Sequence, residues 1–374
     1  MKLGLGLYRH MLTPDNYRFA RQAGATHIVA HLVDYFADKP VLPTSTNSRP
    51  DWGSTDKDKE LWSVDELATL KASIEAEGLQ LAAIENIDPA FWYDVLLDGP
   101  RKEAQLEGLK TIVRRMGEVR IPCLGYNFSI VGVWGHVAGP IARGGAESVS
   151  FREDDLPEQT PVPNGQIWNM QYSDDEPEGS IPNVTSEQIW ERLTGFLTEV
   201  VPVAEEAGVR LAAHPDDPPV TSLRGHARLV HQPHLYQRLL DIVPSHANAL
   251  EFCQGTIAEM SQGSVYEAIE QYSRQGNIAY VHFRNVRGKV PSYQEVFVDE
   301  GDVDMARAID LYYGNGFDGV LIPDHTPQMA CDAPWHAGMA YALGYMRALI
   351  TMVTGKAPNI VEEYSRGANV ELSH

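Results

Sequence analysis

Four side chains that can bind a transition metal come at the ends of four successive apolar segments in the second half of the chain. They are His214, Cys253, His282 and Asp324. Imidazole, thiolate and carboxylate groups are all ligands for divalent transition metals. Each residue alone has an ordinary structural use, as a hydrogen-bonded histidine, a small core cysteine or a turn aspartate. Together, at the same end of consecutive strands, they predict a metal site.

The segment around His214 indicates how such a ligand is held. The run 209–213 is short and apolar, so it is expected to be a buried strand, and three prolines follow within five residues of His214. Because proline fixes φ and has no N–H donor, the strand cannot continue. The sequence therefore predicts a rigid loop that holds the imidazole at the C-terminal end of a strand, where parallel α/β proteins bind ligands.

One thiolate, two imidazoles and one carboxylate suit Zn²⁺ or Fe²⁺ better than Mg²⁺, which prefers oxygen ligands. Mn²⁺ would tolerate this set, although the residues alone do not single it out. The ligand types therefore predict a divalent transition metal and leave its identity open.

Eight short apolar runs alternate with helical patterns and would position these residues. The runs lie at 3–7, 26–32, 79–85, 123–128, 209–214, 249–253, 278–283 and 319–323. Capping patterns mark helix starts at Ser63 with Glu66 and at Thr185 with Gln188. Eight strand–helix units predict a (β/α)₈ TIM barrel. The rival, a doubly wound open sheet, lacks support because no G-x-G-x-x-G follows an early strand.

We expect a single TIM-barrel domain over 1–354, with a long insertion after the fourth strand. That insertion, at about 137–183, is rich in Gly, Pro and acidic residues, and its aromatic side chains favour a partly ordered lid. A closing helix is expected over 341–353. Residues 355–374 are polar and predict a surface tail.

Composition limits the class of protein. The chain has 374 residues, 43% of them hydrophobic, and its 30 basic and 51 acidic residues give a formal charge of −21. This charge disfavours nucleic acid and anionic membranes as partners. The three cysteines have no paired spacing, and we see neither a signal peptide nor a transmembrane segment, so a cytoplasmic protein is expected. A homo-oligomer is compatible with a barrel, but no pattern identifies an interface.

Several motifs together resemble the D-mannonate dehydratase family. They are Arg21-Gln22-Ala23-Gly24-Ala25-Thr26, Tyr126-Asn127-Phe128, His214-Pro215-Asp216-Asp217-Pro218-Pro219, Phe252-Cys253 with Gly255, His282-Phe283-Arg284-Asn285 and Pro323-Asp324-His325. The resemblance implies a barrel related to xylose isomerase. It also implies a Mn²⁺-dependent hydro-lyase of carbohydrate metabolism that converts D-mannonate, or a related aldonate, to a 2-keto-3-deoxy acid such as 2-keto-3-deoxy-D-gluconate.

The same resemblance implies His214, Cys253, His282 and Asp324 as the metal ligands, the four residues that the strand ends also indicate. It implies His325, beside Asp324, as a catalytic acid/base. The reaction removes the proton α to the carboxylate and expels the 3-hydroxyl, so one group must accept a proton and another must donate one. Which residue is the base and which the acid stays open.

Further residues near these motifs are candidates for the site. Arg284 lies two residues after His282, so both point to one side, as a clamp for the substrate carboxylate would require; a salt bridge at the barrel mouth is the alternative. The candidates with catalytic roles are His325, Asp217 and Arg284, and those expected to bind substrate are Arg9, Asn127, Asp216 and Asn285. His226, His231, His234 and His246 are expected on the solvated surface.

The chain departs from the family pattern at two places. An arginine usually precedes the Pro-Asp-His motif and a glycine follows it, where this chain has Ile322 and Thr326. The family tyrosine before the last helix is also absent, and the segment there contains Trp335. We therefore expect the substrate to be decided around Ile322 and Trp335. A xylose-isomerase-like isomerase, epimerase or β-eliminating enzyme on a neutral or keto sugar is the alternative, and a non-catalytic sugar-binding protein a weaker one.

Overall fold

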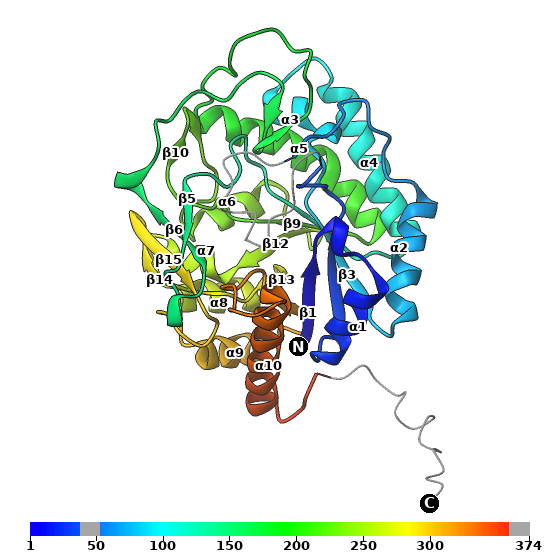
Figure 1. Cartoon of the computed structure of the whole chain (residues 1–374). Helices are drawn as coiled ribbons and strands as arrows, with labels where there is room; N and C mark the ends of the chain where they lie inside the picture. Colours follow the sequence, from blue (N-terminus) through cyan, green and yellow to red (C-terminus); the bar gives the residue numbers. More distant parts are fainter. Residues whose placement is uncertain (38–52, 359–374) are drawn as a thin grey trace, which may run out of the picture.

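A closed barrel of eight parallel strands forms the centre of the computed structural model, which describes residues 1–37 and 53–358 (Figure 1). Around the barrel the strands follow their order in the chain. They are β1 (Lys2–Leu7), β2 (His27–His31), β3 (Gln80–Glu85), β4 (Cys123–Tyr126), β9 (Arg210–Ala213), β12 (Asn248–Cys253), β13 (Ile278–His282) and β16 (Val320–Ile322). The predicted (β/α)₈ barrel is therefore confirmed, and each expected strand has a counterpart.

Helices surround the barrel and connect its strands. They are α1 (Pro14–Gln22), α2 (Val64–Ala76), α3 (Tyr93–Leu97), α4 (Lys102–Glu118), α5 (Ser186–Ala207), α6 (Leu235–Ile242), α7 (Gln254–Glu259), α8 (Val265–Arg274), α9 (Met305–Gly314) and α10 (Pro334–Thr354). Both predicted capping boxes are present, at Ser63 and Thr185. The closing helix α10 begins at Pro334 instead of 341, because proline is well suited to the first turn of a helix.

A second sheet, called the auxiliary sheet here, lies beside the barrel, at the left in Figure 1. It consists of β5 (His136–Gly139), β6 (Ser148–Arg152), β14 (Asn285–Lys289) and β15 (Ser292–Val296), in the order β14-β15-β6-β5. The insertion after β4 thus supplies two strands and the hairpin after β13 the other two. Antiparallel register joins them, with Gln294 opposite Ser150.

The rest of the insertion packs against the loop after β2. Trp168 and Met170, in and beside the turn between β7 (Gln166–Ile167) and β8 (Met170–Gln171), are buried with Tyr35 and Phe36. The expected aromatic packing is therefore present. A lid function for this segment stays a prediction.

One histidine of the presumed surface group is placed differently from the prediction. His226 is 1% exposed, because its strand β11 (His226–Ala227) pairs with β10 (Ser222–Leu223) and bridges to Val184. His231 is partly buried, whereas His234 and His246 are exposed as expected. The solvated-surface interpretation is therefore wrong for His226.

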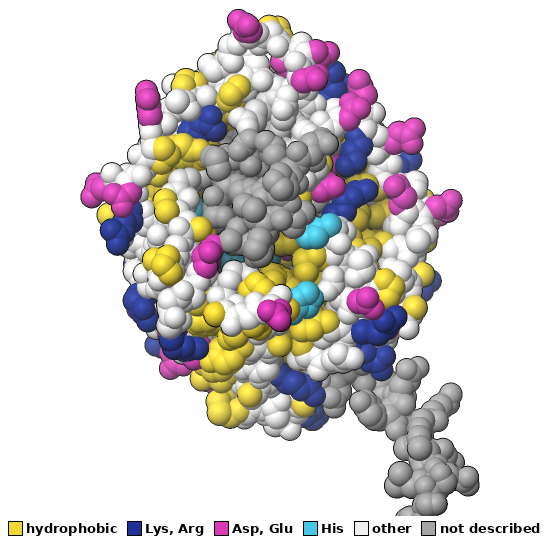
Figure 2. All heavy atoms as spheres, viewed as in Figure 1, with side chains coloured by type: hydrophobic (Ala, Val, Ile, Leu, Met, Phe, Trp, Pro, Cys, Tyr) yellow, Lys and Arg dark blue, Asp and Glu magenta, His cyan; other side chains and the backbone are white. Residues whose placement is uncertain are grey.

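The predicted tail at 355–374 falls partly outside the described residues. Within the described ranges, all three cysteines are free thiols, and no helix has the length and apolarity needed to cross a membrane. On the face shown in Figure 2, acidic and basic side chains are interspersed around the rim and histidines are visible near the centre.

Candidate metal centre and active site

A pocket opens at the C-terminal ends of the barrel strands, and the end of every barrel strand contributes to its lining. The lining residues are Tyr8, His31, Tyr35, Glu85, Asn86, Asn127, Val133, Trp168, His214, Asp217, Glu251, His282, Arg284, Asp324 and His325. Parallel strands carry their C-terminal ends to one mouth, so residues far apart in sequence converge there. The pocket thus brings together seven of the predicted site residues, namely Asn127, His214, Asp217, His282, Arg284, Asp324 and His325.

His214, Cys253 and His282 form a compact cluster of ligand atoms that all lie within 4.8 Å of one another. The Nδ1 atom of His214 is 2.6 Å from the carbonyl oxygen of Pro215, which can only accept, so Nδ1–H donates and Nε2 keeps its lone pair. The Thr256 hydroxyl lies 3.1 Å from the Cys253 sulfur. Such contacts orient ligands in metal sites.

The two ring nitrogens of His282 face different carboxylates. Its Nε2 atom is 3.2 Å from a carboxylate oxygen of Glu85 and 3.2 Å from one of Glu251, and its Nδ1 atom is 3.4 Å from Asp324 Oδ2. Nδ1 is fully buried and makes no hydrogen bond among the described residues. An Nε2–H donated to a carboxylate leaves Nδ1 as the ligand atom, the arrangement that metal-bound histidines adopt.

Asp324 lies beside the cluster, next to His282, and has an unusual backbone conformation. Its φ of 64° lies in the left-handed region, which aspartate tolerates better than most residues. The carboxylate oxygen Oδ2 lies 3.2 Å from Nε2 of His325 and 3.4 Å from Nε of Arg284. Residues held in this region cluster at functional sites.

The electrostatic field of the pocket favours a bound cation. Burial opposes charge on the Cys253 thiol, but Arg284 and the imidazoles of His214 and His282 outweigh it and hold the pKa of this thiol well below its usual range. Burial likewise opposes protonation of His214, yet its hydrogen bond to Cys253 raises its pKa to about 9. A field that favours protonated imidazoles also favours a divalent cation. The donor set and the unpaired Nδ1 of His282 therefore fit a transition metal.

Two buried acids lie beside the cluster. Burial and the neighbouring charge of Glu85 raise the pKa of Glu251 to about 8. For Glu85 burial acts in the same direction, but the imidazoles of His31 and His282 outweigh it and lower its pKa to about 2. One charged acid and one neutral acid are thus held together, as expected for two carboxyl groups that share one histidine.

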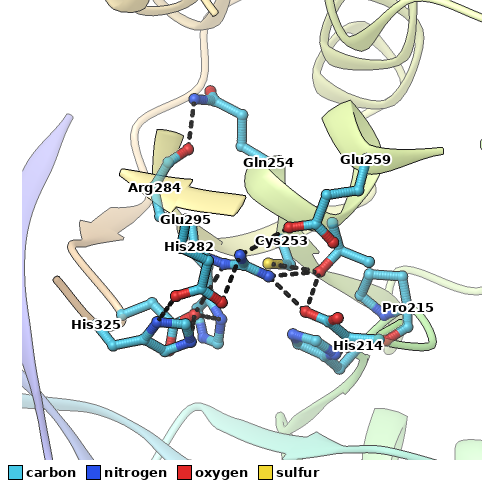
Figure 3. Close-up of polar contacts among 12 residues, drawn as sticks. His214, Pro215, Cys253, Gln254, Glu259, His282, Arg284, Glu295 and His325 are labelled. Carbon is cyan, nitrogen blue, oxygen red and sulfur yellow. Dashed lines mark hydrogen bonds and ion pairs between the residues drawn. The ribbon is translucent and has the colours of Figure 1, made fainter. Parts of the chain in front are cut away.

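Arg284 is placed differently from the predicted carboxylate clamp. Its guanidinium is 3% exposed and donates to Glu259 at 2.8 Å, Glu295 at 3.0 Å, Thr256 at 3.0 Å and Asp217 at 2.5 Å. Four of its five N–H groups are therefore directed at protein acceptors. The structure supports the alternative, a salt-bridged arginine that organises acids at the barrel mouth (Figure 3).

His325 and Asp217 each contact the auxiliary sheet. His325 Nδ1 lies 2.6 Å from Glu295 Oε2, and burial, which opposes protonation, is outweighed by Asp324 and Glu295, which raise the pKa of His325 to about 9. Asp217 accepts a hydrogen bond of 2.9 Å from the Tyr293 hydroxyl. Burial raises the pKa of Asp217, but Arg284 and His136 together lower it below its usual value.

Three predicted substrate-binding residues lie outside the pocket lining. Arg9 donates to the carbonyl of Leu32. Asp216 accepts from the backbone N–H groups of Leu229 and Val230 at 2.8 Å each, and the Asn285 amide ties together the loop that follows β15. Contacts of Arg9, Asp216 and Asn285 with substrate therefore stay predictions.

The two departures from the family pattern also lie outside the pocket lining. Ile322 is 1% exposed and packs inside the barrel with Val320 and Tyr280. Trp335 packs against Phe19, with 6.1 Å between ring centroids, at the start of α10. Neither side chain is among the residues that line the pocket, so the expectation that they decide the substrate is not supported.

Several pocket residues were not predicted. Glu85 and His31 end β3 and β2, so the strand-end pattern that singled out the four ligands applies to them as well. Glu251 precedes Cys253 by two residues and therefore shares its face of the strand. Glu259, Glu295 and Trp168 carry no comparable sequence signal, since they reach the site from α7, from the auxiliary sheet and from the insertion.

The fold and the site define a TIM-barrel protein with a pocket at the C-terminal ends of its strands. The structure of a xylose isomerase domain protein from Planctomyces limnophilus is similar with a TM-score of 0.55 at 12% identity, covering 95% of this chain and 99% of that one, which shows the shared fold. The crystal structure of mannonate dehydratase from Streptococcus suis serotype 2 matches with a TM-score of 0.76 and 25% identity over 100% of this chain and 99% of that chain.

Sequence comparison identifies the family. The family described as D-mannonate dehydratase (UxuA) matches residues 18–358. A mannonate dehydratase from Streptococcus suis is 31% identical over 277 residues, covering 71% of this chain and 75% of the relative. Mannonate dehydratase 2 from Halalkalibacterium halodurans is 30% identical over 276 residues, covering 71% and 79%. The chain belongs to the D-mannonate dehydratase family and is an enzyme of the hydro-lyase class.

Proposed function

We propose that this enzyme dehydrates D-mannonate to 2-keto-3-deoxy-D-gluconate with Mn²⁺ as its cofactor. Family membership supports the reaction. The observation that carries the proposal is the cluster of His214, Cys253 and His282 at the strand-end pocket, with Asp324 next to His282. His325 lies beside Asp324.

The four converging residues would hold the metal ion. His214 offers Nε2, His282 offers Nδ1, and Cys253 and Asp324 offer a thiolate and a carboxylate. When bound, a divalent cation supplies Lewis-acid stabilisation of the negative charge that develops on the substrate carboxylate. Fe²⁺ and Zn²⁺ suit the same donors, so the metal is part of the test.

His325 moves one of the two protons of the reaction at its Nε2 atom. Nδ1 is engaged by Glu295, so Nε2 is the nitrogen available on the side of Asp324. A protonated Nε2 donates to the departing 3-hydroxyl, and a neutral one accepts the proton α to the carboxylate. After the reaction, His325 and the group that moves the other proton have undergone opposite changes in protonation, and proton exchange with solvent restores both groups.

The remaining lining suits the polyhydroxyl chain of a sugar acid. Asn127 and Asn86 offer amide groups to hydroxyls, and the rings of Tyr8 and Trp168 offer apolar faces to C–H groups. Asp217 is held by Arg284 and by the Tyr293 hydroxyl, which keep it charged at the edge of the pocket. These contacts orient the substrate and restrict access of water.

A neutral or keto sugar is the second candidate substrate, for an epimerase or isomerase reaction in the same pocket. It is favoured by one observation. Arg284 is the only arginine or lysine in the described lining, and four of its N–H groups already bind protein acceptors. A neutral substrate needs no further cation, whereas the negative charge of an aldonate carboxylate would be balanced by the metal ion alone.

The test is a metal-supplemented activity screen. Protein stripped with a chelator is supplied with Mn²⁺, Fe²⁺ or Zn²⁺ and incubated with D-mannonate, other aldonates, uronates and keto sugars. Formation of a 2-keto-3-deoxy acid from D-mannonate, lost in Cys253→Ala, supports the proposal. Epimerised or isomerised neutral sugar without any aldonate turnover supports the second candidate and refutes the first.

A further inference from the structure

Glu295 stands out among the unpredicted residues because it connects the auxiliary sheet to the proposed acid/base. It lies on β15, outside the barrel, and is 5% exposed. One carboxylate oxygen is 2.6 Å from Nδ1 of His325 and the other accepts from Arg284 at 3.0 Å. Figure 3 shows it beside His325, with His282 close by. Both of its oxygens are thus committed within the site.

We propose that Glu295 is a positioning residue that holds the His325 imidazole with its Nε2 atom toward Asp324 and the substrate. A charged carboxylate can only accept hydrogen bonds, so Nδ1 of His325 must carry the proton between them. This leaves Nε2 to exchange a proton with substrate. The inference deepens the proposed function and rests on it, because it assigns how the acid/base of that reaction is oriented.

The orientation of His325 needs such a support. The torsion that sets the ring plane of a histidine is broad and roughly two-fold, so packing alone defines it poorly. His325 lines the main pocket and also a small cavity on the auxiliary-sheet side, shared with Ser148 and Thr326. A carboxylate hydrogen bond at Nδ1 selects one ring orientation and one tautomer.

The auxiliary sheet holds both partners of this pair. The Ser148 hydroxyl of β6 donates to the backbone carbonyl of Glu295 at 2.9 Å, and β6 pairs with β15 from Ser292 to Gln294. The N–H of Gln328, in the loop that carries His325, donates to the carbonyl of Glu147 at 2.8 Å. The insertion after β4 therefore anchors the strand bearing Glu295 and the loop bearing His325.

A purely structural role for Glu295 would be to neutralise Arg284. Glu259 provides a matched control for this alternative, because it is fully buried and also accepts from Arg284, at 2.8 Å. Among the contacts described, Glu259 reaches Arg284 and not His325. A Glu→Gln change at either position removes one carboxylate from Arg284. Only the change at Glu295 also replaces the carboxylate that contacts Nδ1 of His325.

The kinetic test compares Glu295→Gln and Glu259→Gln with the wild type, at saturating Mn²⁺ and D-mannonate. Loss of a residue that orients a catalytic group is expected to lower kcat by about 10–100-fold. We expect this loss in Glu295→Gln, with KM changed less than about three-fold and metal content retained, and a smaller loss of kcat in Glu259→Gln. Equal losses in the two variants, or a loss explained by missing metal, would overturn the proposal.

A second measurement uses the wild-type protein and needs no turnover. In ¹⁵N NMR spectra of histidine-labelled enzyme, with His325 assigned from a His325→Gln sample, Nδ1 of His325 should show the shift of a protonated nitrogen. The shift of an unprotonated Nδ1 would refute the positioning role. If the spectrum is as expected but D-mannonate is not converted, the proposed function fails and with it the role of His325 in that reaction, whereas the hydrogen bond by which Glu295 fixes the ring is supported.

Discussion

Replacing Arg284 by methionine separates an arginine that organises buried acids from one that binds substrate. The guanidinium is 3% exposed and makes four hydrogen bonds, three of them to the buried carboxylates of Asp217, Glu259 and Glu295. Methionine is similar in length and removes the charge. The change therefore leaves three acids together in a buried site without their shared cation.

The expected loss of stability follows from the burial of the carboxylates that Arg284 contacts. Hydrogen bonds to charged groups contribute about 1.5–3 kcal/mol each, so the four set an upper limit of about 6–12 kcal/mol, comparable with the whole stability of a domain. Burial raises the pKa of Glu259 well above its usual range, so this acid can take up a proton and relieve part of the repulsion. We therefore expect the free energy of unfolding to fall by about 3–5 kcal/mol, the range for breaking a buried ion pair.

The assay is urea denaturation of the metal-free protein, followed by tryptophan fluorescence. Arg287→Met, on the strand β14 that begins just after Arg284, is the control, because Arg287 is exposed and its loss should change the free energy of unfolding by less than about 0.5 kcal/mol. The organising role is refuted if the free energy of unfolding of Arg284→Met is within about 1 kcal/mol of the wild-type value and the KM for aldonates instead rises ten-fold or more. Arg284 is then the substrate clamp.

Three further outcomes are expected. Cys253→Ala should retain the far-ultraviolet circular dichroism spectrum but lose bound metal by mass spectrometry and lose activity; full metal content would contradict the assigned ligand. Thr256→Val removes a hydroxyl 3.1 Å from the Cys253 sulfur, and should weaken metal affinity about 10–100-fold in chelator competition. Burial and Arg224 lower the pKa of His226 from 6.5 to about 4, so the unfolded chain binds the proton more tightly. The contribution of His226 to stability is therefore intact above pH 6.5 and lost as the pH falls toward 4, and His226→Leu should flatten denaturation midpoints in that window.

The barrel was predictable because its signals are local. Short apolar runs that end in turn residues mark buried strands, and capping boxes such as those at Ser63 and Thr185 mark helix starts. Each strand or helix can therefore be recognised from a window of about ten residues. The auxiliary sheet was not predictable in this way. Ser150 and Gln294 face each other across two strands that lie more than a hundred residues apart in the chain, and neither strand is long or strongly alternating.

In the site, too, local sequence signals identified some residues but not the contacts that depend on tertiary packing. His214, Cys253, His282 and Asp324 were found from sequence because a parallel barrel carries every strand end to one mouth, which makes position along the chain a guide to position in space. The hydrogen-bond partners of Arg284 and Asp216 were not predicted, because a side chain near the mouth can turn toward buried partners and a one-dimensional pattern does not show which of them it contacts.

The sequence by itself therefore determined the barrel, the family and four candidate metal ligands, all of which depend on the order of residues along each strand–helix unit. Tertiary structure alone decided what surrounds those ligands. It placed Glu85 and Glu251 at one nitrogen of His282, and it placed Glu295 at Nδ1 of His325. Such contacts join elements distant in the chain, and their physical effect, a shifted charge or a fixed ring, exists only when the elements pack together.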